Sequence, residues 1–276
     1  MAITPETRQW KAISKSEIGI SHQKRKQPCQ DYGNYLIEGG FLIGAVADGA
    51  GSAKYADIGA KETVTFMINY FQKMISKSKK IFNNNNLSTL AIDISLLPQT
   101  KVKSIFITAI KRLQIKLQKI AEANNCSLKD LACTLILFIA DQKGIYAMQI
   151  GDGFLVIHSP KKDYQLVFLP KKGEYQNETV FVTCDDAIAS MQTTIIEGNY
   201  SFICASTDGL ESVALKLPNY TPFAPFFQPL QEYIFQTQDP EKEETYLINF
   251  LKSERLNVRT NDDKTLLLAL QKSCLI

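Results

Sequence analysis

Acidic residues stand at the ends of several apolar segments in this sequence. Three of them follow an apolar run, at Asp48, Asp152 and Asp208. The other three come just before a run that is rich in apolar residues, at Asp31, Asp262 and Asp263. If these runs are strands whose ends meet, the carboxylates gather at one edge and repel each other unless a cation is bound. Clusters of oxygen donors suit magnesium, manganese or calcium. We therefore expect a metal centre built from carboxylates.

Taken one at a time, these acids have a purely structural explanation. Aspartate and glycine both tolerate positive φ, so the Asp-Gly pairs at Asp48, Asp152 and Asp208 are typical of turns. For Asp152, the apolar runs on both sides favour a simple hairpin. The functional interpretation depends on the combination, because each of these three acids follows an apolar run whose end a folded sheet would bring beside the others.

Composition excludes several other classes of protein. The chain has 276 residues and is 45% hydrophobic, which is enough for a folded core. Its formal charge of +3 is too small to indicate a nucleic-acid partner, and its lysines are spread over helix faces without aromatic residues between them. The six cysteines form no C-x-x-C pair, and two histidines leave little material for a zinc site. No apolar run approaches the roughly 18 residues of a membrane helix, and the N-terminus lacks a signal-peptide pattern, so we expect a cytoplasmic protein.

The elements that position the acids follow from the periodicity of apolar residues. Two strands at 35–38 and 41–47, joined by Gly39-Gly40, predict a hairpin. Helices are expected at 56–75, 104–123, 226–236 and 241–251, with 76–99 as a loop or insertion. Further strands are expected at 132–140, 144–150, 154–158, 164–168, 179–183, 192–197, 200–205 and 265–270. This order predicts an α+β fold in a single domain over residues 1–276.

The order and local context of the motifs are more specific than any one acid. The chain contains SHQKRKQPCQDYG, VADGAGSAKYADIGA, LACTLILFIA, QIGDGFLVI, ASTDGLES and NDDKTLLLAL in this order. In this series it resembles the metal-dependent serine/threonine protein phosphatases of the type 2C family, and most of all a bacterial branch with Ser-His and Pro-Cys-Gln-Asp segments. The resemblance covers residues 17–270. It implies a four-layer α-β-β-α sandwich, in which two antiparallel sheets carry helices outside.

The resemblance also implies a role for each acid. The implied metal-binding residues are Asp31, Asp48, Gly49, Asp152, Asp208 and Asp262, of which Asp48, Asp208 and Asp262 carry catalysis. Asp48 corresponds to the aspartate that bridges two ions, and Gly49 to a glycine whose carbonyl oxygen binds one of them. Asp31 corresponds to an acid that reaches the metal shell directly or through water. Asp152 corresponds to the aspartate that helps to hold a weaker third ion.

The implied reaction is hydrolysis of phosphoserine or phosphothreonine in proteins. Two Mg²⁺ or Mn²⁺ ions would activate a water that attacks phosphorus, so no side-chain nucleophile is needed. Cys29 is a poor nucleophile candidate, because nothing near it in the sequence forms a phosphate-cradling loop. Thr134 corresponds to a small hydroxyl residue of the central strand motif, with a structural role.

Several positions depart from the family pattern. The arginine that grips the substrate phosphate in many members corresponds to Lys26, with Arg25 beside it and His22 as a further candidate. Lysine binds phosphate as a point charge but lacks the two-pronged geometry of arginine. Ala50 stands where animal members carry a histidine proposed as general acid. The fifth motif offers Glu211 or Ser212 where the family often has a second aspartate, which weakens the case for a third ion.

A flap beside the active site is a further implied feature. Residues 170–190, and PKKGEYQNETVFVT at 170–183 above all, resemble the family's flap region. Glu174, Tyr175 and Asn177 are the side chains expected to contact a phosphopeptide. A surface loop that leads into a strand explains any one of these residues equally well.

Two other functions stay open alongside a phosphatase that opposes a serine/threonine kinase. A catalytically weak or silent member would bind a phosphoprotein or a kinase as a regulatory module, and Lys26 and Ala50 favour it slightly. A calcium-stabilised structural domain would use the same acids without hydrolysis. Manganese-dependent hydrolysis of an aryl phosphate discriminates among the three.

Overall fold

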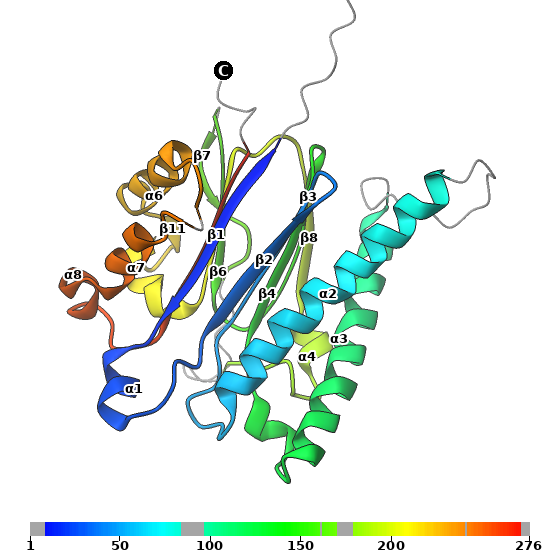
Figure 1. Cartoon of the computed structure of the whole chain (residues 1–276), viewed down its shortest axis with the longest axis vertical. Coiled ribbons are helices and arrows are strands. Elements are labelled where there is room, and N and C mark those ends of the chain that lie inside the picture. The colour runs from blue at the N-terminus through cyan, green and yellow to red at the C-terminus, as the bar shows by residue number, and fades with distance from the viewer. Residues whose placement is uncertain (1–8, 84–96, 161, 170–178, 241, 272–276) are drawn as a thin grey trace, which may run out of the picture.

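Two β-sheets pack against each other, and helices cover the outer face of each (Figure 1). The computed structural model describes residues 9–83, 97–160, 162–169, 179–240 and 242–271. Residues of both sheets share one buried cluster, which includes Leu42, Phe138, Ile203 and Leu267. The α+β sandwich predicted from the sequence is therefore confirmed.

Each sheet has five antiparallel strands. Sheet I has the order β1-β12-β9-β6-β7, with strands β1 (Trp10–Glu17), β12 (Lys264–Gln271), β9 (Phe202–Ser206), β6 (Phe154–Ser159) and β7 (Lys162–Leu166). Sheet II has the order β2-β3-β4-β5-β8, with strands β2 (Tyr32–Glu38), β3 (Phe41–Ala47), β4 (Leu135–Ala140), β5 (Gly144–Ile150) and β8 (Gln192–Glu197). The predicted hairpin at Gly39-Gly40 joins β2 and β3, and both glycines have positive φ, as a tight turn of this kind requires.

The outer layers consist of helices from different parts of the chain. Helices α2 (Ala56–Asn83) and α3 (Gln99–Ala123) share a buried cluster with sheet II. Helices α6 (Ala224–Gln236), α7 (Thr245–Lys252) and α8 (Glu254–Asn257) pack on sheet I. The shorter elements are α1 (Ile20–Arg25), α4 (Ala187–Ser190), α5 (Glu211–Ala214), the 3₁₀ turns at Leu128–Leu131 and Asp208–Leu210, and the β10 (Leu215–Lys216) and β11 (Thr221–Pro222) pair. Within the described ranges, no helix combines the length and the apolar content needed to cross a bilayer.

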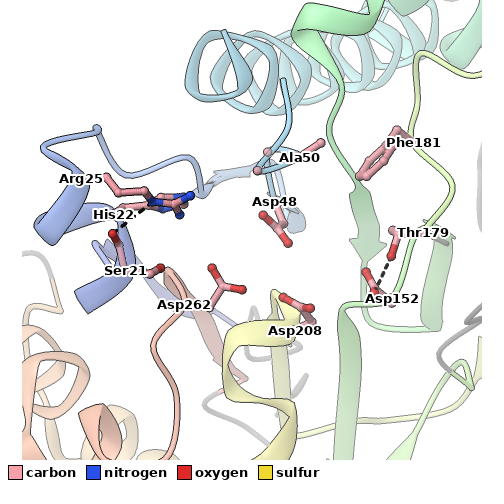
Figure 2. Close-up of a pocket in the computed structure, with 12 residues that line it drawn as sticks. Ser21, His22, Arg25, Asp48, Ala50, Asp152, Thr179, Phe181, Asp208 and Asp262 are labelled. Atoms are coloured by element: carbon pink, nitrogen blue, oxygen red, sulfur yellow. Dashed lines mark hydrogen bonds between the residues drawn. The ribbon is translucent and has the colours of Figure 1, made fainter. Parts of the chain in front are cut away.

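The continuous apolar runs of the central strands follow from this layering. In β4, Leu135, Leu137 and Ile139 face the helices of sheet II, whereas Ile136 and Phe138 face sheet I. Successive side chains of a strand point to opposite faces, so a strand covered on both faces needs apolar residues at every position. The same packing brings the ends of β3 and β9 to one end of the sandwich, where acids follow both strands (Figure 2).

The structure corrects the predictions made for the helices. Helix α2 continues through residues 76–83, which we expected to be a loop, because lysine and serine do not interrupt a helix that apolar residues already anchor. Helix α3 begins at Gln99 instead of Ser104. Residues 84–96 of the expected loop lie outside the described residues. Helix α7 begins at Thr245, four residues after the expected start.

The strands differ from the sequence analysis at three places. Strand β1 was not predicted, because lysines and serines interrupt its apolar pattern. Residues 179–183 form no strand, although Val182 donates a backbone hydrogen bond to Cys133. The Gly-Asp-Gly segment at Asp152 is not a hairpin, because β5 belongs to sheet II and β6 to sheet I. The chain crosses between the two sheets at Asp152.

Candidate active site

An open pocket of about 260 Å³ lies at the end of the sandwich where the acids gather. Its lining residues come from segments far apart in the sequence: Ser21, His22, Arg25, Asp48, Gly49, Ala50, Gly51, Asp152, Thr179, Phe181, Asp208 and Asp262. Figure 2 shows Asp48, Asp208 and Asp262 around its centre and Asp152 on one side. Four of the predicted metal-binding aspartates, together with Gly49, therefore surround one space.

Each acid is placed by the end of a strand. Asp48 directly follows β3, and Asp208 begins the 3₁₀ turn after β9. Asp262 lies two residues before β12, and Asp152 lies in the crossover from sheet II to sheet I. Both sheets thus contribute ligand candidates to the same pocket, which explains why the acids are widely separated along the chain.

The electrostatics of the pocket show that the carboxylates are crowded. Burial raises the pKa of Asp48 well above its ordinary value, and the charges of Asp31, Asp208 and Asp262 raise it further. Burial raises the pKa of Asp208 to about 7, with further contributions from Asp152 and Asp262. Each ionised form is therefore costly in the metal-free protein, and a divalent cation would relieve that cost.

Asp31 lies behind the pocket and is not among its lining residues. It is buried, and Thr207 donates a hydrogen bond of 2.6 Å from Oγ1 to Asp31 Oδ2. The charge of Asp31 raises the pKa of Asp48, so these two carboxyl groups are neighbours. Burial raises the pKa of Asp31, and the nearby Asp263 and Asp208 raise it further. Asp31 therefore lies beside Asp48 on the buried side of the pocket.

The backbone on both sides of Asp48 is held in position. Thr134 accepts a hydrogen bond of 3.0 Å from Asp48 N on its Oγ1, and its own backbone N donates to Asp48 O at 2.7 Å. Gly49 packs so closely on the start of α2 that a Cβ would lie 2.7 Å from the Cβ of Ala56. Only glycine fits at position 49 without displacing helix α2. The two hydrogen bonds of Thr134 hold the backbone of Asp48, as a structural role for Thr134 would require.

Asp263 is the site residue whose role the sequence did not reveal. Its Oδ1 accepts a hydrogen bond of 2.6 Å from Gly19 N, and its Oδ2 accepts one of 2.6 Å from Gln30 N. The same Oδ2 lies 2.9 Å from His22 Nδ1. Adjacent residues of an extended chain point to opposite sides, so Asp262 reaches the pocket while Asp263 joins the β1–α1 junction to the segment before β2.

The structure separates the three candidates for gripping phosphate. His22 and Arg25 line the pocket, and Arg25 Nε donates a hydrogen bond of 3.2 Å to Ser21 O. Lys26 does not line it: the residue caps α1 in the left-handed conformation, with φ 57°, and is exposed. Lys26 corresponds to the family's arginine in the sequence, but its side chain does not line the pocket. Helix α1 ends at Arg25, one residue before Lys26.

The predicted flap is described only at its C-terminal part. Glu174, Tyr175 and Asn177 lie outside the described residues. Further along, Thr179 and Phe181 line the pocket, and Thr179 Oγ1 donates a hydrogen bond of 2.8 Å to Asp152 Oδ2. The sequence prediction had singled out neither Thr179 nor Phe181, since residue type alone does not distinguish them from loop residues.

The site lacks features of a thiol nucleophile. Burial raises the pKa of the Cys29 thiol far above its ordinary value, and the charges of Asp31 and Asp263 raise it further. A thiol in this environment stays protonated and is a poor nucleophile. The exclusion of Cys29 agrees with the sequence analysis.

The donor set fits hard divalent cations. All the pocket acids offer carboxylate oxygens, which magnesium and manganese prefer over softer ligands. Among the residues that the structure describes, no three acidic, histidine or cysteine side chains close into a compact ligand cluster. The acids instead surround an open space, which suits an ion that keeps several waters and takes only one or two carboxylates. Glu211 is buried nearby and adds to the negative field around Asp208.

Comparisons with known proteins agree with this fold and site. The family model described as protein phosphatase 2C matches residues 18–252. Over 268 residues the chain is 31% identical to serine/threonine-protein phosphatase 3 of Escherichia coli strain K12, covering 95% of this chain and 98% of that one. Similar solved structures include a variant of a bacterial serine phosphatase, with a TM-score of 0.62, 14% identity and coverage of 95% and 98%. The serine/threonine phosphatase Stp1 of Staphylococcus aureus has a TM-score of 0.61, with 13% identity and 95% coverage of both chains.

The architecture shows that the chain has the same fold as these two solved bacterial phosphatases. Within that class, it belongs to the protein phosphatase 2C family, because the family model and the Escherichia coli relative both span most of it. The family is metal-dependent, and one structural neighbour, RsbX, was solved in complex with magnesium.

Proposed function

We propose that this protein hydrolyses phosphoserine and phosphothreonine in other proteins, with two Mg²⁺ or Mn²⁺ ions as cofactors. The observation that carries the proposal is the convergence of Asp48, Asp208 and Asp262 on one pocket of a family member. These three aspartates, with the carbonyl of Gly49, would hold the two ions. Asp31 would support the shell from behind, and Asp152 would help to hold a weaker third ion.

The chain's own residues fit this chemistry. When bound, the ions would lower the pKa of a water and offset the negative charge of the phosphoryl group. Arg25 would bind the phosphoryl oxygens through a guanidinium that can donate two hydrogen bonds at once. The pocket volume of about 260 Å³ is smaller than most small-molecule sites, which favours a single phosphorylated side chain over a large ligand.

The biological setting is part of the proposal. We infer a phosphoprotein substrate, an opposing serine/threonine kinase and a cytoplasmic location. The free state of the five described cysteines, including buried Cys133 and Cys204, supports a reducing compartment. We also propose that residues 1–276 form a single phosphatase domain, which the pairing of β1 with β12 supports, since it joins the two ends of the described chain.

Peptide hydrolysis tests the proposed function directly. With Mn²⁺ present, the pure protein should release phosphate from phosphoserine and phosphothreonine peptides, measured as inorganic phosphate against time. A phosphopeptide that binds without being hydrolysed would instead favour the regulatory module. Ala50 is the residue that favours this alternative, because animal members carry a proposed general acid at that position. Calcium binding with neither hydrolysis nor peptide binding would favour a structural domain.

The adjacent cations of α1 offer a matched pair of variants. We expect Arg25→Ala to raise KM for an aryl phosphate by about 10-fold or more, because it removes a charge-assisted contact worth about 1.5–3 kcal/mol. Lys26→Ala should change KM less than about 2-fold, since this exposed residue does not line the pocket. The measurement is steady-state kinetics of both variants at one metal concentration. If Lys26→Ala raised KM more than Arg25→Ala did, the phosphate-binding residue would be Lys26 and not Arg25.

A further inference from the structure

A buried histidine faces the pocket with a carboxylate behind it. His22 is only 4% exposed, yet it lines the pocket (Figure 2). Its Nδ1 is buried and lies 2.9 Å from Asp263 Oδ2, within ion-pair distance although the N–H direction is not aligned for an ideal hydrogen bond. Since Nδ1 is turned toward Asp263, the far edge of the ring, which carries Nε2, is the part available to the pocket.

Asp263 is held firmly enough to orient this ring. It is 2% exposed, and the backbone N–H groups of Gly19 and Gln30 each donate to it at 2.6 Å. These two contacts, one to each carboxylate oxygen, fix the position and the orientation of the Asp263 side chain. A buried carboxylate beside one imidazole nitrogen fixes the tautomer and the orientation of the ring, so that the other nitrogen is the one that faces the substrate.

Hydrolysis of a phosphoserine needs such a proton. The departing serine oxygen is a strongly basic alkoxide unless it is protonated as the ester bond breaks. Among the described lining residues, Arg25 offers a guanidinium, and Ser21 and Thr179 offer hydroxyls. Neither type of group is a good proton donor in catalysis. Ala50 has no polar side chain. His22 is the one imidazole on the described wall of the pocket.

We propose that His22, oriented by Asp263, is the general acid that protonates the leaving serine or threonine oxygen. The inference rests on the proposed phosphatase activity and adds a catalytic residue to it. Water adds to phosphorus, the phosphorus–ester oxygen bond breaks, and the ester oxygen takes the proton from Nε2 of protonated His22. The proton released by the attacking water returns the ring to its starting state through solvent. The overall reaction converts one phosphoester and one water into one alcohol and one inorganic phosphate.

Two substrates with different leaving groups isolate this role. A general acid matters for the alkoxide of a phosphothreonine peptide and matters little for p-nitrophenyl phosphate, whose phenolate leaves without protonation. We expect His22→Gln to lower kcat/KM by at least about 100-fold on the peptide and by less than about 10-fold on p-nitrophenyl phosphate. The matched control is His158→Gln, which alters the other histidine, stacked on Tyr164 in sheet I, and should change neither rate.

The outcomes distinguish this inference from the function on which it rests. Equal losses on both substrates would assign His22 to phosphate binding or to folding and would overturn the inference alone. A wild-type protein that hydrolyses neither substrate would overturn the proposed function and the inference together. A second measurement needs neither activity nor a folded variant: ¹⁵N spectra of the metal-free wild type should show neutral His22 protonated on Nδ1. Protonation on Nε2 instead would contradict the orienting role of Asp263.

Discussion

Replacing Asp48 with asparagine should remove the activity while the chain stays folded. Asp48 follows β3, lines the pocket and lies close to Asp31, Asp208 and Asp262. In the proposed function, Asp48 would help to hold both ions, and a loss of about 4 kcal/mol of charge stabilisation corresponds to a fall of about 1,000-fold in kcat. The measurement is phosphate release by Asp48→Asn at saturating Mn²⁺.

The metal-free Asp48→Asn variant should be more stable than the metal-free wild type, although it loses activity. Asparagine keeps the size of the side chain and removes a carboxylate that burial and the charges of Asp31, Asp208 and Asp262 disfavour. The metal-free variant should therefore have a higher Tm than the metal-free wild type. Asp163→Asn, an exposed aspartate on β7, is the matched control and should change neither Tm nor activity appreciably. Near-normal turnover by Asp48→Asn would contradict the two-ion assignment.

The acids and their order could be predicted because they depend on local patterns. A strand buried on both faces reads as a continuous apolar run, as β4 does, and the residue after such a run lies at the end of the sheet. Asp48 and Asp208 were found in this way. Nothing in the pattern around Asp152 indicates that the chain leaves one sheet for the other there, because a hairpin and a crossover use the same turn residues.

The choice among the candidates of the first motif depends on helical phase and on distant partners, which the sequence does not reveal. Helix α1 is six residues long, and its polar sequence ISHQKR carries no amphipathic signal. Within it, Ser21 and Arg25 are four residues apart and share a face, whereas Lys26 falls beyond the last turn. The sequence comparison selected Lys26 because it lies five positions before Asp31. That spacing takes no account of which side of helix α1 a residue occupies. The contact between His22 and Asp263 spans most of the chain, and only the pairing of β1 with β12 creates it.

Removal of divalent metal should abolish hydrolysis, and Mn²⁺ or Mg²⁺ should restore it. Zn²⁺ should be a poor substitute, because the described lining of the pocket offers carboxylate oxygens around an open space and no cysteine, whereas zinc favours a closed set of cysteine and histidine ligands. The measurement is phosphate release after exhaustive chelation and after each ion is added back. Full activity after chelation would contradict the metal-centre assignment.

The pH dependence of metal binding gives this prediction a second readout. Burial and neighbouring charge raise the pKa of Asp208 to about 7, above the roughly 3.9 of an unfolded aspartate. In the metal-free protein, the favourable contribution of protonated Asp208 is complete below pH about 4 and is lost as the pH rises through about 7. Because ions bind the deprotonated carboxylate, Mn²⁺ should raise Tm more at pH 8 than at pH 5.5. Asp208→Asn should weaken this pH dependence, and a Tm increase equal at both pH values would show that the ion binds elsewhere.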